Sequence, residues 1–467
     1  MAKKMNKTGK YIVYLLLSLF TTAALISSCT DRNGLGDPDH PNDKTSLSIS
    51  FHSAQQTRVG NGLRSNEIGE DVIERESAIY SLAVLVFKNG NNELDGKKFI
   101  DREIIEIPGS GYKDYKELDE IKGIELTSGI RDVYIIANAP DGHFSNVTDR
   151  LSFREKLEEL SAQGVYDHPE GAGTSSGDIP IGGEEPDDRH TNLVMTQSFT
   201  GLPVNSGAKK HYLGYTGNGG LPDGETTGTP LNGTNPVELV RLVARVAIQK
   251  IAFDLPEMLA FDGYSTREYN HYVDTVFMIN AKTVSSYFPE DGTFPNPEGF
   301  FGHGNTIGYE FLKNQSSSVA DGSTYAAYLY KPINFKEYDI TQNQVPLWFY
   351  AFENKDSASS PTGFVIGVKY QYKGPGNELK RKKVYYPVVV NSTGGGSRGN
   401  NHRYIKRNNQ YGIKVTIKGL GSFVANYPEV RSVALPPMNS LWDAAGAVEI
   451  EETVGTDLFP WTGNVYK

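Results

Sequence analysis

Residues 237–253 read VELVRLVARVAIQKIAF, and this stretch decides which class of fold the chain adopts. Arg241 and Arg245 stand four positions apart and would share one face of a helix, whereas the alternation along the stretch fits a strand equally well. Four of its residues are valines, whose branched side chains favour an extended backbone. We therefore predict one long β-strand here.

Shorter runs on both sides of this stretch are also typical of β-strands. Residues 46–51 alternate serine with apolar residues, and residues 79–87 (IYSLAVLVF) are apolar on both faces and end at a turn sequence, KNGN. Further strand-like runs are residues 133–137, 193–195, 272–279, 325–330, 346–352, 363–372, 383–390 and 411–417. One convincing helix is predicted at residues 152–161, where Ser152 and Glu155 resemble a capping box. The sequence thus predicts an all-β fold with one or two short helices.

The N-terminus has the pattern of an exported lipoprotein. Four lysines precede an apolar stretch at residues 11–26, which is short for a transmembrane span and typical of a secretory signal. The stretch ends in ISS followed by the only cysteine, Cys29, and this resembles a bacterial lipobox. We expect signal cleavage between Ser28 and Cys29 and lipid on Cys29, although any signal peptide can carry a cysteine near its end. The polar residues 29–44 predict a tether.

Charge and composition exclude several classes of function. The formal net charge is −10, which disfavours nucleic acid and anionic membranes as electrostatic partners. A single cysteine leaves no intramolecular disulfide and no cysteine-based zinc site. The nine histidines never pair at the spacing of a zinc-binding helix. We expect no cofactor and no metal.

Motifs that could carry chemistry are better explained as loops or surface charge. Residues 173–177 (GTSSG) match a nucleophile elbow, and residues 394–399 (GGGSRG) match a dinucleotide-binding loop, but neither lies in the required strand-to-helix turn. The acidic residues 184–190 lack the spacing of a calcium loop, and the basic run at residues 380–383 is typical of a solvated strand edge. We therefore predict that the protein is not an enzyme.

Five short motifs resemble those of one family. They are residues 131–138 (RDVYIIAN), 193–196 (LVMT), 240–246 (VRLVARV), 385–391 (YYPVVVN) and 407–411 (RNNQY), the last leading into the strand-like sequence of residues 413–417. Their order along a lipoprotein with two β-rich halves is similar to the major fimbrial subunits of Bacteroidetes, the type V pilins. The resemblance spans residues 1 to about 420.

The resemblance implies two tandem transthyretin-like β-sandwich domains, at residues 59–246 and 247–467, preceded by a propeptide strand within residues 45–58. It also implies protease-triggered strand exchange. An Arg-specific protease would cut after Arg58, before Val59, or as a second choice after Arg64, before Ser65. The C-terminal strand of another subunit would then replace the propeptide strand by β-augmentation.

The donor segment implied by this scheme is residues 447–465. Its apolar anchors are Val448, Ile450, Val454, Leu458, Trp461 and Val465. Glu452 interrupts the apolar face, while Gly455 and Pro460 would break a continuous ladder of hydrogen bonds.

The expected product is a structural subunit of a fimbrium that serves adhesion. The precursor would be lipid-anchored to the outer membrane, and its partners would be other copies of itself, related fimbrial subunits and a surface receptor. The irregular tail keeps an anchor or tip subunit as an alternative. Trp348 is expected in the core, whereas Trp442 and Trp461 could stack on sugars, so a glycan-binding lipoprotein that does not polymerise is a second alternative.

Overall fold

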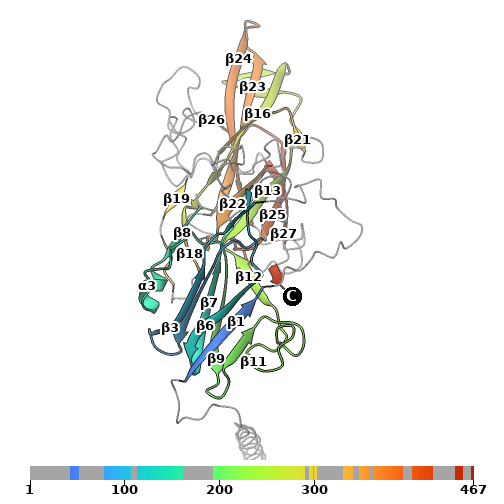
Figure 1. Cartoon of the computed structure of the whole chain (residues 1–467). Coiled ribbons are helices and arrows are strands. Elements are labelled where there is room, and N and C mark those ends of the chain that lie inside the picture. Colours follow the sequence, from blue (N-terminus) through green and yellow to red (C-terminus); the bar gives the residue numbers. More distant parts are fainter. Residues whose placement is uncertain are drawn as a thin grey trace, which may run out of the picture.

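The protein is almost entirely β-structure, as the sequence predicts. The computed structural model describes residues 43–51, 78–106, 113–160, 193–289, 294–297, 299–301, 330–339, 347–356, 361–392, 402–423, 448–455 and 464–466. Within these ranges there is one helix, α3 (Arg150–Arg154). Figure 1 shows an elongated molecule whose N-terminal and C-terminal halves lie end to end.

The N-terminal half contains two sheets that share a core. The first has the order β11-β10-β1-β6 and consists of β11 (Thr229–Pro230), β10 (Lys210–Leu213), β1 (Lys44–Ser50) and β6 (Glu120–Thr127). The second has the order β28-β12-β9-β7-β2-β3 and consists of β28 (Asn464–Tyr466), β12 (Val237–Arg241), β9 (Met195–Val204), β7 (Gly129–Ala137), β2 (Leu82–Lys88) and β3 (Leu94–Ile100). Leu47 and Ile49 of the first sheet pack with Val84 and Ile135 of the second in one apolar cluster. Such alternation of inward apolar residues is what a half-buried strand requires.

The C-terminal half also contains two larger sheets. In one, β13 (Val243–Phe253) pairs in parallel with β25 (Gln410–Ile417), and on its other side with β22 (Leu347–Phe352) and β21 (Tyr338–Asp339); β27 (Val448–Gly455) forms the edge next to β25. The other has the order β20 (Tyr330–Phe335), β16 (Tyr269–Ile279), β23 (Gly363–Lys373), β24 (Leu379–Val389) and β26 (Ser422–Phe423). Trp348 of β22 is buried in the core that these sheets share, as predicted.

Four two-stranded sheets complete the described fold. They are β4 (Ile104–Glu106) with β5 (Lys113–Tyr115), β14 (Leu259–Phe261) with β15 (Tyr264–Thr266), β17 (Ala281–Lys282) with β19 (Phe300–Phe301), and β18 (Val284–Ser286) with β8 (Leu157–Glu159).

The pairing of β8 with β18 joins the two halves. Beside it, Tyr134 of β7 makes edge-on ring contacts with Phe288 and Phe294, which follow β18. Residues of the C-terminal half therefore cover part of the outer face of the six-stranded N-terminal sheet, and a single apolar cluster includes both Phe87 and Val276. The two halves therefore share this apolar core.

Two predictions about individual elements are wrong. Residues 237–253 are extended, but they form two strands rather than one, because the chain bends at Leu242. Strand β12 pairs with β9 in the N-terminal half, and β13 pairs with β22 and β25 in the C-terminal half. The apolar pattern continues through the bend because β12 packs into the core of the N-terminal half and β13 into that of the C-terminal half.

The predicted helix at residues 152–161 is shorter and starts earlier. Asp149 caps α3 and forms a capping box with Ser152, so the helix begins at Arg150; it ends at Arg154 rather than continuing to residue 161. Leu157, which lies within the predicted helix, instead belongs to β8, which pairs with β18. Pairing with a distant strand overrides local helix propensity here.

Candidate functional site

Strand β1 lies between β10 and β6 in the N-terminal half, and the position that it fills is called the groove below. It is hydrogen-bonded on both sides, in parallel to β10 and antiparallel to β6, so it is an inner strand of its sheet (Figure 1). Leu47, Ile49 and Phe51 are fully buried. The strand predicted at residues 46–51 is thus present, and its alternate residues form part of the core. Removing it would expose apolar surface and two rows of unpaired backbone groups.

A glycine shapes the end of this groove. Gly214, directly after β10, has φ of +83°, a conformation that favours glycine. A Cβ atom at this position would collide with the carbonyl oxygen of Ser50 and with the side chain of Val237. Close approach of the backbone to the last residues of β1 therefore requires glycine here.

The C-terminal segment lies against its own subunit. Strand β27 pairs antiparallel with β25, and β28 pairs antiparallel with β12, so the tail follows one edge from the C-terminal half to the N-terminal half. On the exposed face of β27, Glu451 pairs with Lys414 at 3.1 Å between Oε1 and Nζ, and Glu449 pairs with Lys418. Val448 is half-buried and Ile450 is exposed, while Leu458 and Trp461 lie outside the described residues, as do the side chains of Val454 and Val465.

Glu452 is the unusual residue of β27. Its carboxylate is half-buried and accepts a hydrogen bond of 2.6 Å from the backbone N–H of Asn391. Burial raises the pKa of Glu452 to about 7, and the hydrogen bond from Asn391 only partly offsets this effect. A carboxyl group whose pKa is higher in the folded protein stabilises the fold in its protonated form, so this strand should pair less tightly as the pH rises from about 4.5 through 7.

We therefore expect Glu452→Gln to stabilise the docking of β27 above pH 7 by about 1–3 kcal/mol and to remove its pH dependence between pH 5 and 8. Hydrogen exchange of the β27 amides at both pH values measures this effect. Glu451→Gln, on the exposed face of the same strand, is the matched control and should retain the pH dependence. Equal exchange of wild-type β27 at pH 5 and 8 would contradict the expectation.

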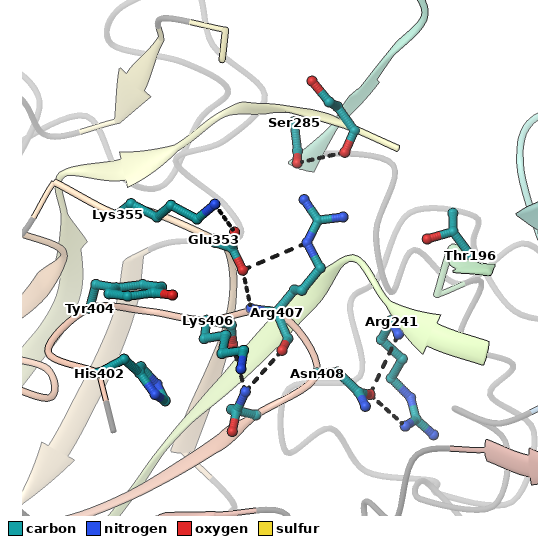
Figure 2. A network of polar contacts seen from close by, with 12 residues as sticks. Thr196, Arg241, Ser285, Glu353, Lys355, His402, Tyr404, Lys406, Arg407 and Asn408 are labelled. Carbon is teal, nitrogen blue, oxygen red and sulfur yellow. Dashed lines mark hydrogen bonds and ion pairs between the residues drawn. The ribbon is translucent and has the colours of Figure 1, made fainter. Parts of the chain in front are cut away.

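Two of the sequence motifs meet where the halves join. The side chain of Asn408 accepts a hydrogen bond of 3.3 Å from the guanidinium of Arg241, and the backbone N–H of Arg245 donates to Asn409 O at 2.9 Å. Figure 2 shows Arg407 directed toward Glu353, with 3.8 Å between Nε and Oε2. A guanidinium nitrogen of Arg407 also donates to the carbonyl oxygen of Tyr287 at 3.2 Å. Motifs 240–246 and 407–411 therefore build the junction of the two halves.

Neither a metal site nor a set of unpaired lysines in the basic run is found in the described part of the chain. No group of three or more His, Cys, Asp or Glu side chains there could hold a metal ion. In the basic run, Lys383 pairs with Asp274 at 3.0 Å, and Lys380 pairs with Glu378 at 3.0 Å. Lys382 also pairs with a carboxylate, that of Asp262. These lysines are thus neutralised by neighbours of their own sheet region.

Several predicted positions lie outside the described residues. They are Ser28, Cys29, Arg58, Val59, Arg64, Ser65, Trp442, and residues 173–177, 184–190 and 394–399. None of the helices described in the structure is both long and apolar enough to pass through a bilayer.

Comparison with known proteins finds similarity to fimbrial subunits. Residues 45–179 match the family model described as major fimbrial subunit protein (FimA). The chain is 24% identical over 409 residues to a candidate fimbrium tip subunit, Fim1C, of Parabacteroides distasonis, covering 87% of this chain and 88% of that protein. It is 21% identical over 448 residues to the major fimbrium subunit FimA type-2 of Porphyromonas gingivalis, covering 88% and 91% of the two chains.

A solved structure has the same fold. A candidate cell adhesion protein from Parabacteroides distasonis ATCC 8503 superposes with a TM-score of 0.52 at 20% identity, covering 89% of this chain and 99% of that one. The class defined by the fold is that of elongated, all-β proteins. Within this class, the sequence matches are to fimbrial subunits of Bacteroidetes, the family that the motifs of the chain resemble.

Proposed function

We propose that this protein is a structural subunit of a cell-surface fimbrium that assembles by donor-strand exchange. The observation that carries the proposal is the position of β1 as an inner strand whose apolar residues belong to the core. The chain between β1 and β2 contains both Arg58 and Arg64. Cleavage after either residue would free β1 to leave its groove.

The proposed assembly follows from the chemistry of an open sheet. Loss of β1 leaves unpaired N–H and C=O groups on β10 and β6. These groups can form hydrogen bonds with another strand. A strand from the tail of a second subunit would enter with main-chain hydrogen bonds and alternating apolar side chains. Because this contact joins the C-terminal tail of one copy to the N-terminal half of the next, it does not close on itself and builds a filament. Lipid on Cys29 would hold the precursor on the outer membrane until the cut.

A second candidate is a terminal subunit, at the tip or the base of the fimbrium. Strands β27 and β28 pair within their own chain, and a tail held in this way is not available to a neighbour. Such a subunit would accept one contact and end the filament. An anchor would keep both β1 and its lipid.

N-terminal sequencing of the protein isolated from assembled fimbriae, combined with its heat-resistant ladder on a gel, tests these proposals. A start at Val59 or Ser65 with a ladder supports the exchanged shaft subunit. Processed protein found once per fibre, with an unchanged fibre length after deletion of residues 447–467, supports the tip subunit. An acylated Cys29 with monomer alone refutes polymerisation and supports an anchor or a surface glycan-binding lipoprotein.

A further inference from the structure

A buried histidine contacts the strand that fills the groove. His211 of β10 has 0% of its surface exposed. Its Nδ1 lies 3.0 Å from Oγ1 of Thr45 in β1, and its Nε2 accepts a hydrogen bond of 3.1 Å from the backbone N–H of Asn205. The Thr45 hydroxyl donates at 2.8 Å to the carbonyl oxygen of Ala208.

Only one assignment of donors and acceptors satisfies all three hydrogen bonds. The N–H of Asn205 can only donate, so Nε2 must be unprotonated, and the proton of the neutral ring is assigned to Nδ1. Nδ1–H then donates to Thr45, whose own hydroxyl proton is used on Ala208. The chain of hydrogen bonds is complete only when a hydroxyl group stands at the position of Thr45, because a hydroxyl both accepts and donates.

We propose that His211 selects the strand that occupies this groove by requiring a hydroxyl group at the position of Thr45, ahead of apolar side chains at the next three alternate positions. In β1 these positions are Leu47, Ile49 and Phe51. This inference rests on the proposed function, because it names the chemistry of the strand that the groove accepts. Apolar side chains supply the binding free energy. The histidine helps to fix the register, since a shift that places Leu47 at the position of Thr45 would bring an apolar group to Nδ1–H.

The same histidine makes the groove sensitive to acid. Protonation of Nε2 would place two N–H donors against each other, at Nε2 and at Asn205. Burial alone lowers the pKa of His211, and the charged residues of the strands around it, Lys44, Lys210 and Glu125, are exposed. Strand β1 contacts the ring through Thr45 and helps to bury it, so an occupied groove favours neutral imidazole, whereas an empty groove exposes the ring to water and lets it take up a proton near the ordinary pKa of histidine, about 6.5. Strand binding is complete above about pH 6.5 and weakens as the pH falls below it.

Peptide competition tests the selection of the hydroxyl group. The full chain, with one engineered protease site between β1 and β2, is cut and its β1 is displaced by a peptide of residues 43–51 (DKTSLSISF) at pH 7.5. Thr45→Val in the peptide should weaken binding about ten- to a hundredfold, because it leaves Nδ1–H buried without an acceptor. Thr45→Ser should bind within about threefold of the parent peptide. Ser46→Ala, which removes the exposed neighbouring hydroxyl, is the matched control and should change binding by less than about twofold.

The pH dependence provides an independent readout. Affinity of the parent peptide should fall about fivefold between pH 6.5 and 5.5, since one proton is linked to strand release and half of the free rings are already protonated at pH 6.5. In His211→Gln, which keeps a donor and an acceptor but does not titrate, affinity should not change over this range.

The outcomes separate this inference from the proposed function. If no peptide displaces β1, the groove does not exchange strands and the proposed assembly fails. If peptides bind but Thr45→Val equals the parent peptide, His211 does not select the strand. If the wild-type protein shows no change between pH 6.5 and 5.5, or His211→Gln shows the same change, the histidine is not acid-sensitive in the way proposed. The displacement of β1 and the comparison of Thr45→Val with the parent peptide are both measured on the wild-type groove, so they remain decisive even if His211→Gln does not fold.

Discussion

Replacing Arg58 and Arg64 together by alanine is expected to abolish polymerisation while the monomer folds normally. In the uncut chain, β1 is tied to its groove through the segment that leads to β2. A short tether keeps a strand at an effective concentration in the millimolar range. A donor strand from another subunit, present at far lower concentration, cannot displace a covalently attached strand of similar affinity.

Cleavage changes this balance because β1 can then diffuse away. Its fully buried side chains, Leu47, Ile49 and Phe51, each contribute about 1.5–3 kcal/mol through burial, so release is slow but irreversible once the strand is diluted. The donor then competes with a free peptide rather than with a tethered one. We therefore expect the ladder of polymers to disappear completely in the double variant, as measured on a gel without heating.

A third variant provides the control. The double alanine variant, supplied with a different protease site between β1 and β2, should form no polymer until that protease is added, and should then polymerise as the wild type does. Recovery would show that the arginines matter because they are cut. A normal ladder from the uncut double variant would refute the processing model.

The sequence predicts the strands of this protein well where side-chain alternation carries the information. Strand β1 follows from the alternation of serine with Leu47, Ile49 and Phe51, and β2 from its run of apolar residues, because both patterns reflect directly which faces are buried. The break at Leu242 has no such signal. Both β12 and β13 are apolar, and only their different partner strands divide them.

The candidate site is only partly predictable for a related reason. The groove follows from β1, but His211 and Thr45 are separated by 166 residues, and neither sits in a motif. A lone histidine in a short strand is usually a satisfied core residue, so spacing alone gives no reason to connect it with the N-terminus. Likewise the motifs at residues 240–246 and 407–411 lie far apart in the sequence, and only the parallel pairing of β13 with β25 brings them together.

Replacing Asp132 by alanine is expected to destabilise the protein by about 3–5 kcal/mol, because it removes the partner of a buried charge. Asp132 and Arg150 are both buried, with 2.8 Å between Oδ2 and a guanidinium nitrogen. The other carboxylate oxygen accepts hydrogen bonds of 2.8 Å from Asn89 Nδ2 and from the backbone N–H of Gly201. The carboxylate therefore connects α3, the turn after β2, and β9.

The protonation of Asp132 follows from these contacts. Burial alone would raise its pKa, but the hydrogen bonds from Asn89 and Gly201 and the guanidinium of Arg150 outweigh burial and hold the pKa below its usual range. Its contribution to stability is therefore complete above about pH 3.8 and is lost as the pH falls through the lower pKa of the folded state.

Urea unfolding at pH 7 measures the loss, and two further variants identify its cause. Arg150→Met in the Asp132→Ala background removes the uncompensated guanidinium and should recover most of the stability, because a buried ion pair replaced as a whole by apolar groups costs little. Glu103→Ala, which breaks the exposed 2.8 Å ion pair with Lys116, should change stability by less than about 1 kcal/mol. If Asp132→Ala costs no more than Glu103→Ala, the carboxylate does not hold these three elements together. A large loss that Arg150→Met fails to recover would instead assign the stabilisation to the other hydrogen bonds of this pair: those that Asp132 accepts from Asn89 and Gly201, and those that Arg150 donates to the carbonyl oxygens of Lys88 and Asn91.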